Sequence, residues 1–282
     1  MSAPVLPAQP EWGAQTLQQA LGLWLPGLSL EVLASTDSTN TRLLERARAG
    51  EARPVLLVAE QQTSGRGRLG RAWRSEPGAS LTFSLLLELT RADWSGLSLA
   101  VGAAIADALE PPEPPNTRPP RITLKWPNDL WLRDGPGRGR KLGGVLIESV
   151  APAGRRMAVV GVGLNVAPLS GVANAEGLSH GLACLREIDP EAAAPGALAR
   201  VAPALVQALQ RFDAEGFAPF AAGFARRDLL VGLEVSTSAP EAPRGVAEGV
   251  DAQGALRVRA GAVHHVVSGE VSVRWPPPAE SP

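Results

Sequence analysis

The sequence predicts an α+β fold with a small β-rich unit at its C-terminal end. Segments with strand patterns dominate first, helices follow from about 195 to 227, and short strands with glycine turns come after 229. This order differs from the regular strand–helix alternation of a doubly wound sheet. The length of 282 residues suffices for one domain of ordinary size plus a small second one.

The first part of the chain combines amphipathic helices with apolar strands. The segment STDSTN is rich in N-cap residues and Gly50 is a stop signal, so they bracket one helix. Apolar side chains alternate from Leu81 to Leu87, which is typical of a strand. The pattern predicts helices at 11–25, 41–50 and 94–109 and strands at 54–61 and 79–89.

A proline-rich linker at 111–120 precedes the next group of strands. Strands are expected at 122–132, 141–150 and 156–167, joined by hairpin-like turns. We therefore predict an N-terminal extension with one short helix at 1–30, a main domain at 31–228 and a small β-domain at 229–275.

Composition excludes several classes of protein. The net charge is −1, so no global basic field attracts nucleic acid or anionic lipid. The single cysteine, Cys184, rules out an internal disulfide and fits a reducing, cytoplasmic setting. The first residues carry no signal-peptide pattern, and no run of about 18 apolar residues predicts a membrane span.

Lysine is rare in this chain. Among 27 basic residues only Lys125 and Lys141 are lysines, and all others are arginines. Because an ammonium and a guanidinium differ in shape, hydration and ability to lose a proton, these two positions are expected to need an ammonium.

The loop GRGRLGR at 65–71 contains the G-x-G-x-x-G pattern of dinucleotide-binding proteins. That fingerprint needs a helix directly after the loop, whereas Pro77 and Gly78 interrupt this region. The pattern instead favours a loop that wraps closely around an anionic ligand, with Arg66, Arg68 and Arg71 facing its charge. A flexible, solvated loop is the alternative.

Five motifs follow one another along the chain. They are DSTN at 37–40, AEQQTS followed by GRGRLGR and Trp73, KWPND at 125–129, KLGGVLIE at 141–148 and GVGLN at 161–165. In this order they resemble the motifs of biotin–protein ligases, and the close resemblance covers about 35–170. It implies a mixed, SH2-like catalytic sheet with helices packed on one side, related to class II tRNA synthetase cores. The tail is similar to the small SH3-like β-barrel of that family in length and pattern only.

The resemblance implies a two-step ligase reaction. Biotin and ATP would form biotinyl-5'-AMP, and a lysine of a biotin carboxyl carrier protein would then take the biotin. Mg²⁺ would accompany ATP, with no protein metal ligand predicted. About 35 residues precede DSTN and hold one predicted helix, so we expect a ligase-only, cytoplasmic member that binds neither DNA nor membrane. A homodimer is possible.

The resemblance also assigns catalytic roles. Lys141 would stand between the biotin carboxylate and the α-phosphate and stabilise the transition state. Arg66 and Arg68 would neutralise the two anions, on a loop that orders as a lid. Arg71 could be structural. Lys125 could attract the carrier or set the position of Asp129.

The remaining expected contacts divide between biotin and ATP. Ser38, Thr39 and Gln62 would contact the ureido ring, although the first two could simply cap a helix. Trp73 would stack on adenine, although a core role is the alternative. The full expected sets are Ser38, Thr39, Asn40, Gln62, Arg66, Gly67, Arg68, Lys141, Gly143 and Gly144 for biotin, and Arg68, Trp73, Asn128, Lys141 and Asn165 for ATP.

Three other functions fit parts of the sequence. A lipoate–protein ligase shares the fold and chemistry, but DSTN and KWPND weigh against it. A nucleic-acid-binding module could use the arginine loop, but the net charge of −1 argues against it. A nucleotide-binding regulator without catalysis leaves Lys141 unexplained.

Overall fold

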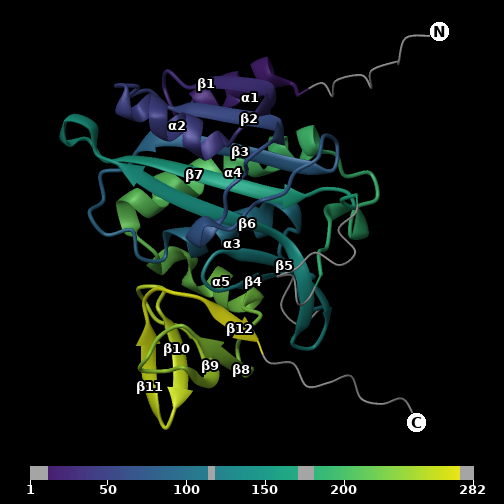
Figure 1. Cartoon of the computed structure of the whole chain (residues 1–282), viewed down its shortest axis with the longest axis vertical. Helices are drawn as coiled ribbons and strands as arrows, with labels where there is room; N and C mark the ends of the chain where they lie inside the picture. Colours follow the sequence, from purple (N-terminus) through teal and green to yellow (C-terminus); the bar gives the residue numbers. More distant parts are fainter. Residues whose placement is uncertain (1–11, 114–117, 171–180, 274–282) are drawn as a thin grey trace.

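The computed structural model describes residues 12–113, 118–170 and 181–273. Most of its strands form one mixed sheet in the order β1-β2-β3-β7-β6-β5-β4 (Figure 1). β1 and β2 are parallel, and the other neighbours are antiparallel. The strands are β1 (Ser29–Thr36), β2 (Val55–Gln62), β3 (Ser80–Glu88), β4 (Ile122–Lys125), β5 (Asp129–Gly135), β6 (Arg138–Val150) and β7 (Met157–Asn165).

Helices cover both faces of this sheet. One face packs against α1 (Ala14–Gly22), α3 (Leu97–Leu109) and α4 (Ala194–Glu215). The other face packs against α2 (Thr39–Arg48) through a smaller cluster of apolar residues. The expectation that helices pack on one side is therefore incomplete.

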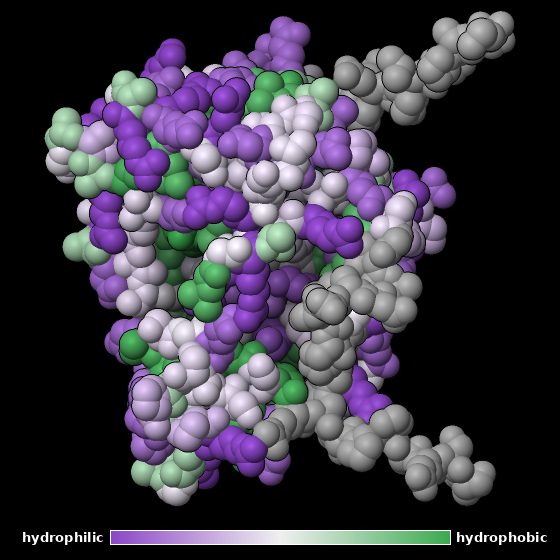
Figure 2. All heavy atoms as spheres, viewed as in Figure 1, coloured by the Kyte–Doolittle hydropathy of each residue, from purple (hydrophilic) through white to green (hydrophobic). Residues whose placement is uncertain are grey.

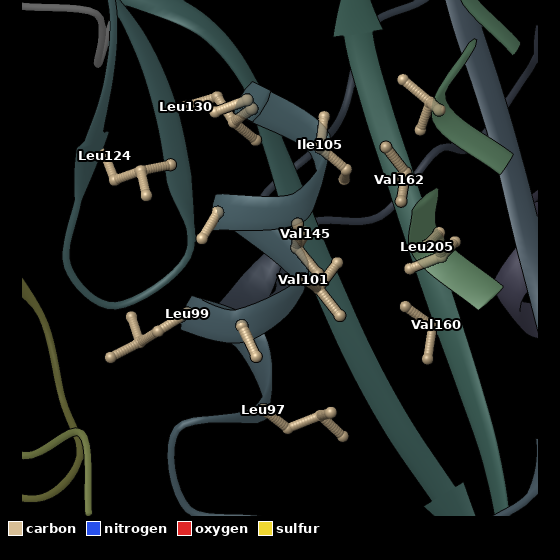
Figure 3. Packing of buried hydrophobic residues seen from close by; sticks show 14 of the residues in the cluster. Leu97, Leu99, Val101, Ile105, Leu124, Leu130, Val145, Val160, Val162 and Leu205 are labelled. Carbon is tan, nitrogen blue, oxygen red and sulfur yellow. The ribbon is translucent and has the colours of Figure 1, made fainter. Parts of the chain in front are cut away.

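Alternation along the central strands builds the larger core. Leu81, Phe83, Leu85 and Leu87 of β3 all point toward the α3 and α4 face, as their spacing requires. α3 is rich in alanine and lies against β4, β5 and β6. Figure 3 shows Val101 and Ile105 of α3 facing strand and helix side chains; those labelled there include Val145, Val160, Val162 and Leu205.

A second sheet lies at one end of the molecule, beyond α5 (Ala221–Arg227) (Figure 1). In the described residues its antiparallel strands have the order β11-β10-β9-β8-β12, and closure into an SH3-like barrel stays a prediction. We propose that this domain begins near Leu229, where the main chain leaves β4. Its strands are β8 (Glu234–Thr237), β9 (Arg244–Val250), β10 (Leu256–Ala260), β11 (Ala262–Val266) and β12 (Val271–Val273).

The predicted α+β class with a C-terminal β-unit is confirmed, with two corrections to its elements. β1 was not predicted, and the proposed domain boundary at residue 31 falls inside it. The expected strand at 122–132 is two strands, because Pro127 lacks an N–H and lies in the turn between β4 and β5. Part of the predicted linker, residues 114–117, lies outside the described residues.

Candidate functional site

A cavity of about 660 Å³ opens on the face of the large sheet that also carries α2. Figure 2 shows the molecule hollowed near the middle of this face, between the large and the small sheet. Gly161 and Gly163 of β7 line the cavity, and a Cβ at these positions would collide with the Asn40 amide and the Trp73 ring. The cavity brings together every predicted site residue except Gly143.

The N-terminus of α2 forms one wall. Ser38 caps the helix, because its Oγ accepts a hydrogen bond from the Thr41 N–H at 3.4 Å. Thr39 donates to Gln62 Oε1 through its N–H at 2.7 Å and its Oγ1 at 3.1 Å. Ser38 therefore both caps α2 and lines the cavity, two roles that the sequence left open.

Asn40 connects α2 to the sheet and is almost fully buried. Its Nδ2 donates to Glu148 Oε2 at 3.0 Å, and its Oδ1 accepts from Ser84 Oγ at 2.6 Å. Arg66 Nη2 bonds the other oxygen of Glu148 at 3.2 Å. Gly161 is required here because a Cβ would collide with the Asn40 side-chain amide. Glu148 thus links the arginine loop to the helix start.

The arginine loop is a tight hairpin. The Gly67 N–H donates to Arg71 O at 2.7 Å, and the Trp73 N–H donates to Gly65 O at 2.8 Å. A Cβ on Gly65 would lie 2.5 Å from Trp73 O, so that glycine serves chain closure. Leu69, at the tip, has φ +54° and is 73% exposed, in a backbone region that side chains disfavour.

Two arginines of this loop contact the small domain. Arg68 donates to Asn128 Oδ1 at 3.3 Å and to Gly269 O at 3.1 Å. Burial lowers the pKa of the Arg68 guanidinium, although nearby carboxylates oppose this. Arg71 forms an ion pair with Glu270 at 2.5 Å. Residues before and in β12 therefore close one side of the cavity.

Lys141 stands on β6 and points into the cavity. Its Nζ is 2.8 Å from Asp129 Oδ1 at the start of β5, and both side chains are mostly shielded. The register of β5 and β6 shifts here: Leu130 pairs with Gly143 and Trp131 with Lys141, so Leu142 of β6 is the extra residue of a β-bulge. Bulges re-aim side chains and recur next to active sites. Gly144 lies beside the lysine, since a Cβ there would be 3.7 Å from Nζ.

Lys125 has a different partner. Its Nζ donates to Val271 O of β12 at 2.7 Å, and it lies 5.3 Å from the centre of the Trp131 ring. Burial lowers the Lys125 pKa, Asp129 opposes that shift, and Lys141 adds to it. The lysine therefore ties the small domain to the cavity wall.

The two residues expected to contact adenine, Trp73 and Asn165, have different surroundings. The Trp73 ring lies against Gly163, and its Nε1 is buried without an acceptor among the described residues. Asn165 Nδ2 donates to Ala183 O at 3.0 Å and Lys141 O at 3.3 Å. Gly143 packs on β7, where a Cβ would lie 2.5 Å from Gly163 O.

The described residues contain no cluster of three or more His, Cys, Asp or Glu that could hold a metal ion. The nearest carboxylate to Lys141, Asp129, is already paired with it. Among the described residues, no helix is long and apolar enough to cross a membrane either.

Comparisons with known proteins agree with this geometry. Residues 32–165 match the biotin/lipoate A/B protein ligase family, and residues 236–274 match the biotin protein ligase C-terminal domain. The bifunctional ligase/repressor BirA of Escherichia coli is 33% identical over 91% of this chain and 77% of its own length. The biotin–[acetyl-CoA-carboxylase] ligase of Mycobacterium tuberculosis is 33% identical over 89% of this chain and 90% of its own.

The chain belongs to the biotin protein ligase family. A biotin protein ligase from Aquifex aeolicus, solved with biotin and ATP, is 30% identical with a TM-score of 0.70, over 87% of this chain and 98% of that one. The family predicted from the motifs and its enzyme class, an ATP-dependent ligase acting on biotin, are confirmed and favoured over the lipoate alternative.

Sequence reasoning missed several residues of the site. Asp129 was named without a role, yet it holds Lys141. Glu148 ends the KLGGVLIE motif and could have been noticed as the carboxylate that follows the apolar run 142–147. Glu270 gave no signal, because its partner Arg71 is 199 residues away.

Proposed function

We propose that this chain activates biotin with ATP and transfers the biotinyl group to a lysine of a biotin carboxyl carrier protein. Lys141 carries the proposal: it is the cation that enters the cavity next to a single carboxylate, at the point where two anionic substrates must meet. We place the reaction in the cytoplasm and expect no DNA binding, and a homodimer stays possible.

The first step joins two anions. A biotin carboxylate oxygen attacks the α-phosphorus of ATP, the bond to the bridging oxygen breaks, and pyrophosphate leaves. Lys141 offsets the repulsion between carboxylate and phosphate and stabilises the charge of the transition state. Asp129 holds the ammonium in place through the 2.8 Å ion pair. Mg²⁺ would travel with the phosphates, since the described carboxylates form no metal site.

Biotin would lie with its ureido ring toward the start of α2. Ser38, Thr39 and Gln62 line this end and offer hydroxyl, amide and backbone groups to the ring's two N–H donors and its carbonyl. Asn40 lies behind them and already has its own partners, so it positions this wall. Gly67 and Gly144 leave room for the ligand at the lysine end.

The nucleotide would occupy the side bounded by the loop and the small domain. Trp73 offers a ring for adenine and a buried N–H that has no acceptor in the part of the chain that the structure describes. Asn128 lies beside Arg68 at this end of the cavity. The amide nitrogen of Asn165 holds two backbone carbonyls, so the side chain would meet adenine through its oxygen.

The second step needs a closed site. The carrier's amine attacks the acyl carbon, AMP leaves with the bonding electrons, and the nitrogen loses a proton. Until then the mixed anhydride must be kept from water. Arg66 and Arg68 contact the sheet, Asn128 and the small domain, and these contacts support a role for their loop as a lid over the cavity.

Exchange of labelled pyrophosphate into ATP tests the first step alone. The account predicts exchange that depends on biotin and is not supported by lipoate. Exchange with lipoate instead would assign the chain to the other branch of its fold, and exchange with neither would remove the activation step.

A further inference from the structure

Lys141 lies beyond the last pair of residues that join β6 to β7. That pairing runs from Gly143 to Val150 of β6 and ends there. Beyond that point, residues 181–183, which follow β7 in the chain, pair with the edge of β6 at Lys141. The Lys141 N–H donates to Gly181 O at 3.2 Å, and the Ala183 N–H donates to Lys141 O at 2.8 Å. One side of the lysine's backbone is therefore held by a loop.

Arg140 fastens this loop. Its guanidinium donates to Glu187 at 2.7 and 3.1 Å, to Asp134 at 2.7 to 3.2 Å, and to Leu182 O at 3.2 Å. Glu187 Oε1 in turn accepts from the Cys184 N–H at 3.0 Å. The arginine thus joins the β5–β6 hairpin to both halves of 181–188, which we call the return segment.

The arrangement is more extensive than a surface ion pair. Arg140 uses Nε and both terminal nitrogens, and a planar fork of donors meets two carboxylates and a carbonyl at once. A lysine could satisfy only part of this set, since its ammonium is a point donor. Arg140 is also the immediate neighbour of Lys141 in the chain, so a displacement of the Arg140 guanidinium also displaces the backbone of Lys141.

We propose that Arg140, acting through Glu187, is a positioning residue for the activation of biotin: it clamps the return segment against the backbone of Lys141 and so fixes where the ammonium stands. Arg140 touches no reactant in this role. The inference rests on the proposed function, because the clamp matters for the reaction only if Lys141 is the catalytic cation.

The test compares single variants in biotin-dependent pyrophosphate exchange. Arg140→Gln and Glu187→Gln should each lower kcat about tenfold, because small misplacements of a catalytic group are costly. The KM values for biotin and ATP should change less than threefold. Arg140→Lys should recover part of the loss. The kcat of the double variant should be no lower than that of Arg140→Gln, because both changes break the same contact between Arg140 and Glu187.

Arg155→Gln is the matched control. Arg155 forms an ion pair with Glu88 through two of its nitrogens, far along the sheet from the cavity. Its loss should leave kcat within twofold of the parent.

Three results would overturn the clamp: unchanged kcat in both single variants, a rise in KM alone, or fully additive losses in the double variant. If Arg140→Gln failed to fold, Glu187→Gln would decide by the same criteria. An inactive parent enzyme would instead count against the proposed function, so the two failures are distinguishable.

Discussion

Replacing Lys141 by arginine keeps its positive charge but changes the position of that charge. The Nζ atom is 2.8 Å from Asp129 Oδ1, and the backbone of Gly144 lies next to the end of the side chain. A guanidinium is longer and planar, so its nitrogens would pass the carboxylate and enter the space reserved for the reactants. Folding should be little affected, because the partly exposed pair is worth at most about 1 kcal/mol.

The expected magnitude follows from the loss of one preorganised transition-state donor. Such a loss costs about 2.7–4 kcal/mol, or roughly 10²- to 10³-fold in kcat. Pyrophosphate exchange at saturating biotin and ATP measures this directly, with circular dichroism to check the fold. Lys125→Arg is the comparison, because Lys125 already donates to Val271 O and should lose far less. Exchange by Lys141→Arg within threefold of the parent would refute the catalytic role.

Three further changes test other parts of the site and fold. Arg68→Gly removes the contacts to Asn128 and Gly269. Because one charge-assisted contact is worth about 1.5–3 kcal/mol, the adenylate should escape at least about tenfold faster. Streptavidin blots of added albumin would measure the labelling by escaped adenylate, and equal labelling by parent and variant would contradict the lid. Gly163→Ala puts a methyl against the Trp73 ring and should raise the KM for ATP more than that for biotin, whereas equal changes would contradict a role at adenine. Burial raises the pKa of Asp228 from 3.8 to about 6, so the folded state holds that proton more tightly and stability falls as pH rises through this window. Asp228→Asn should remove about 1–3 kcal/mol of this fall, measured as the difference between urea-unfolding free energies at pH 4 and 7.5; an identical pH profile would contradict it.

Local signals in the sequence predicted much of the site. The cap at Ser38 and a loop at 65–71 were predicted from a few neighbouring residues, whereas the hairpin form of that loop was not. The alternation in β3 correctly predicted which side chains face the larger core. Likewise, the two lysines were singled out by rarity, and both line the cavity.

Long-range contacts were not predictable in the same way. β1 is an edge strand of half-buried residues, so its apolar pattern is weak although its pairing with β2 is regular. The contacts of Gly269 with Arg68 and of Val271 in β12 with Lys125 join positions more than 140 residues apart. Residues 181–183 can pair with Lys141 only because the pairing of β6 with β7 ends before it. The end of that pairing is set by contacts between strands, and the local composition does not predict it.

The central claim is transfer of biotin to a carrier lysine, and intact mass spectrometry of a purified biotin carboxyl carrier domain tests it most directly. After incubation with this protein, ATP, Mg²⁺ and biotin, the domain should gain the mass of one biotin less one water. The gain should disappear when the carrier's acceptor lysine is replaced or the Lys141→Arg enzyme is used for the same short time. No gain with the parent enzyme, or a gain seen only when lipoate replaces biotin, would contradict the account.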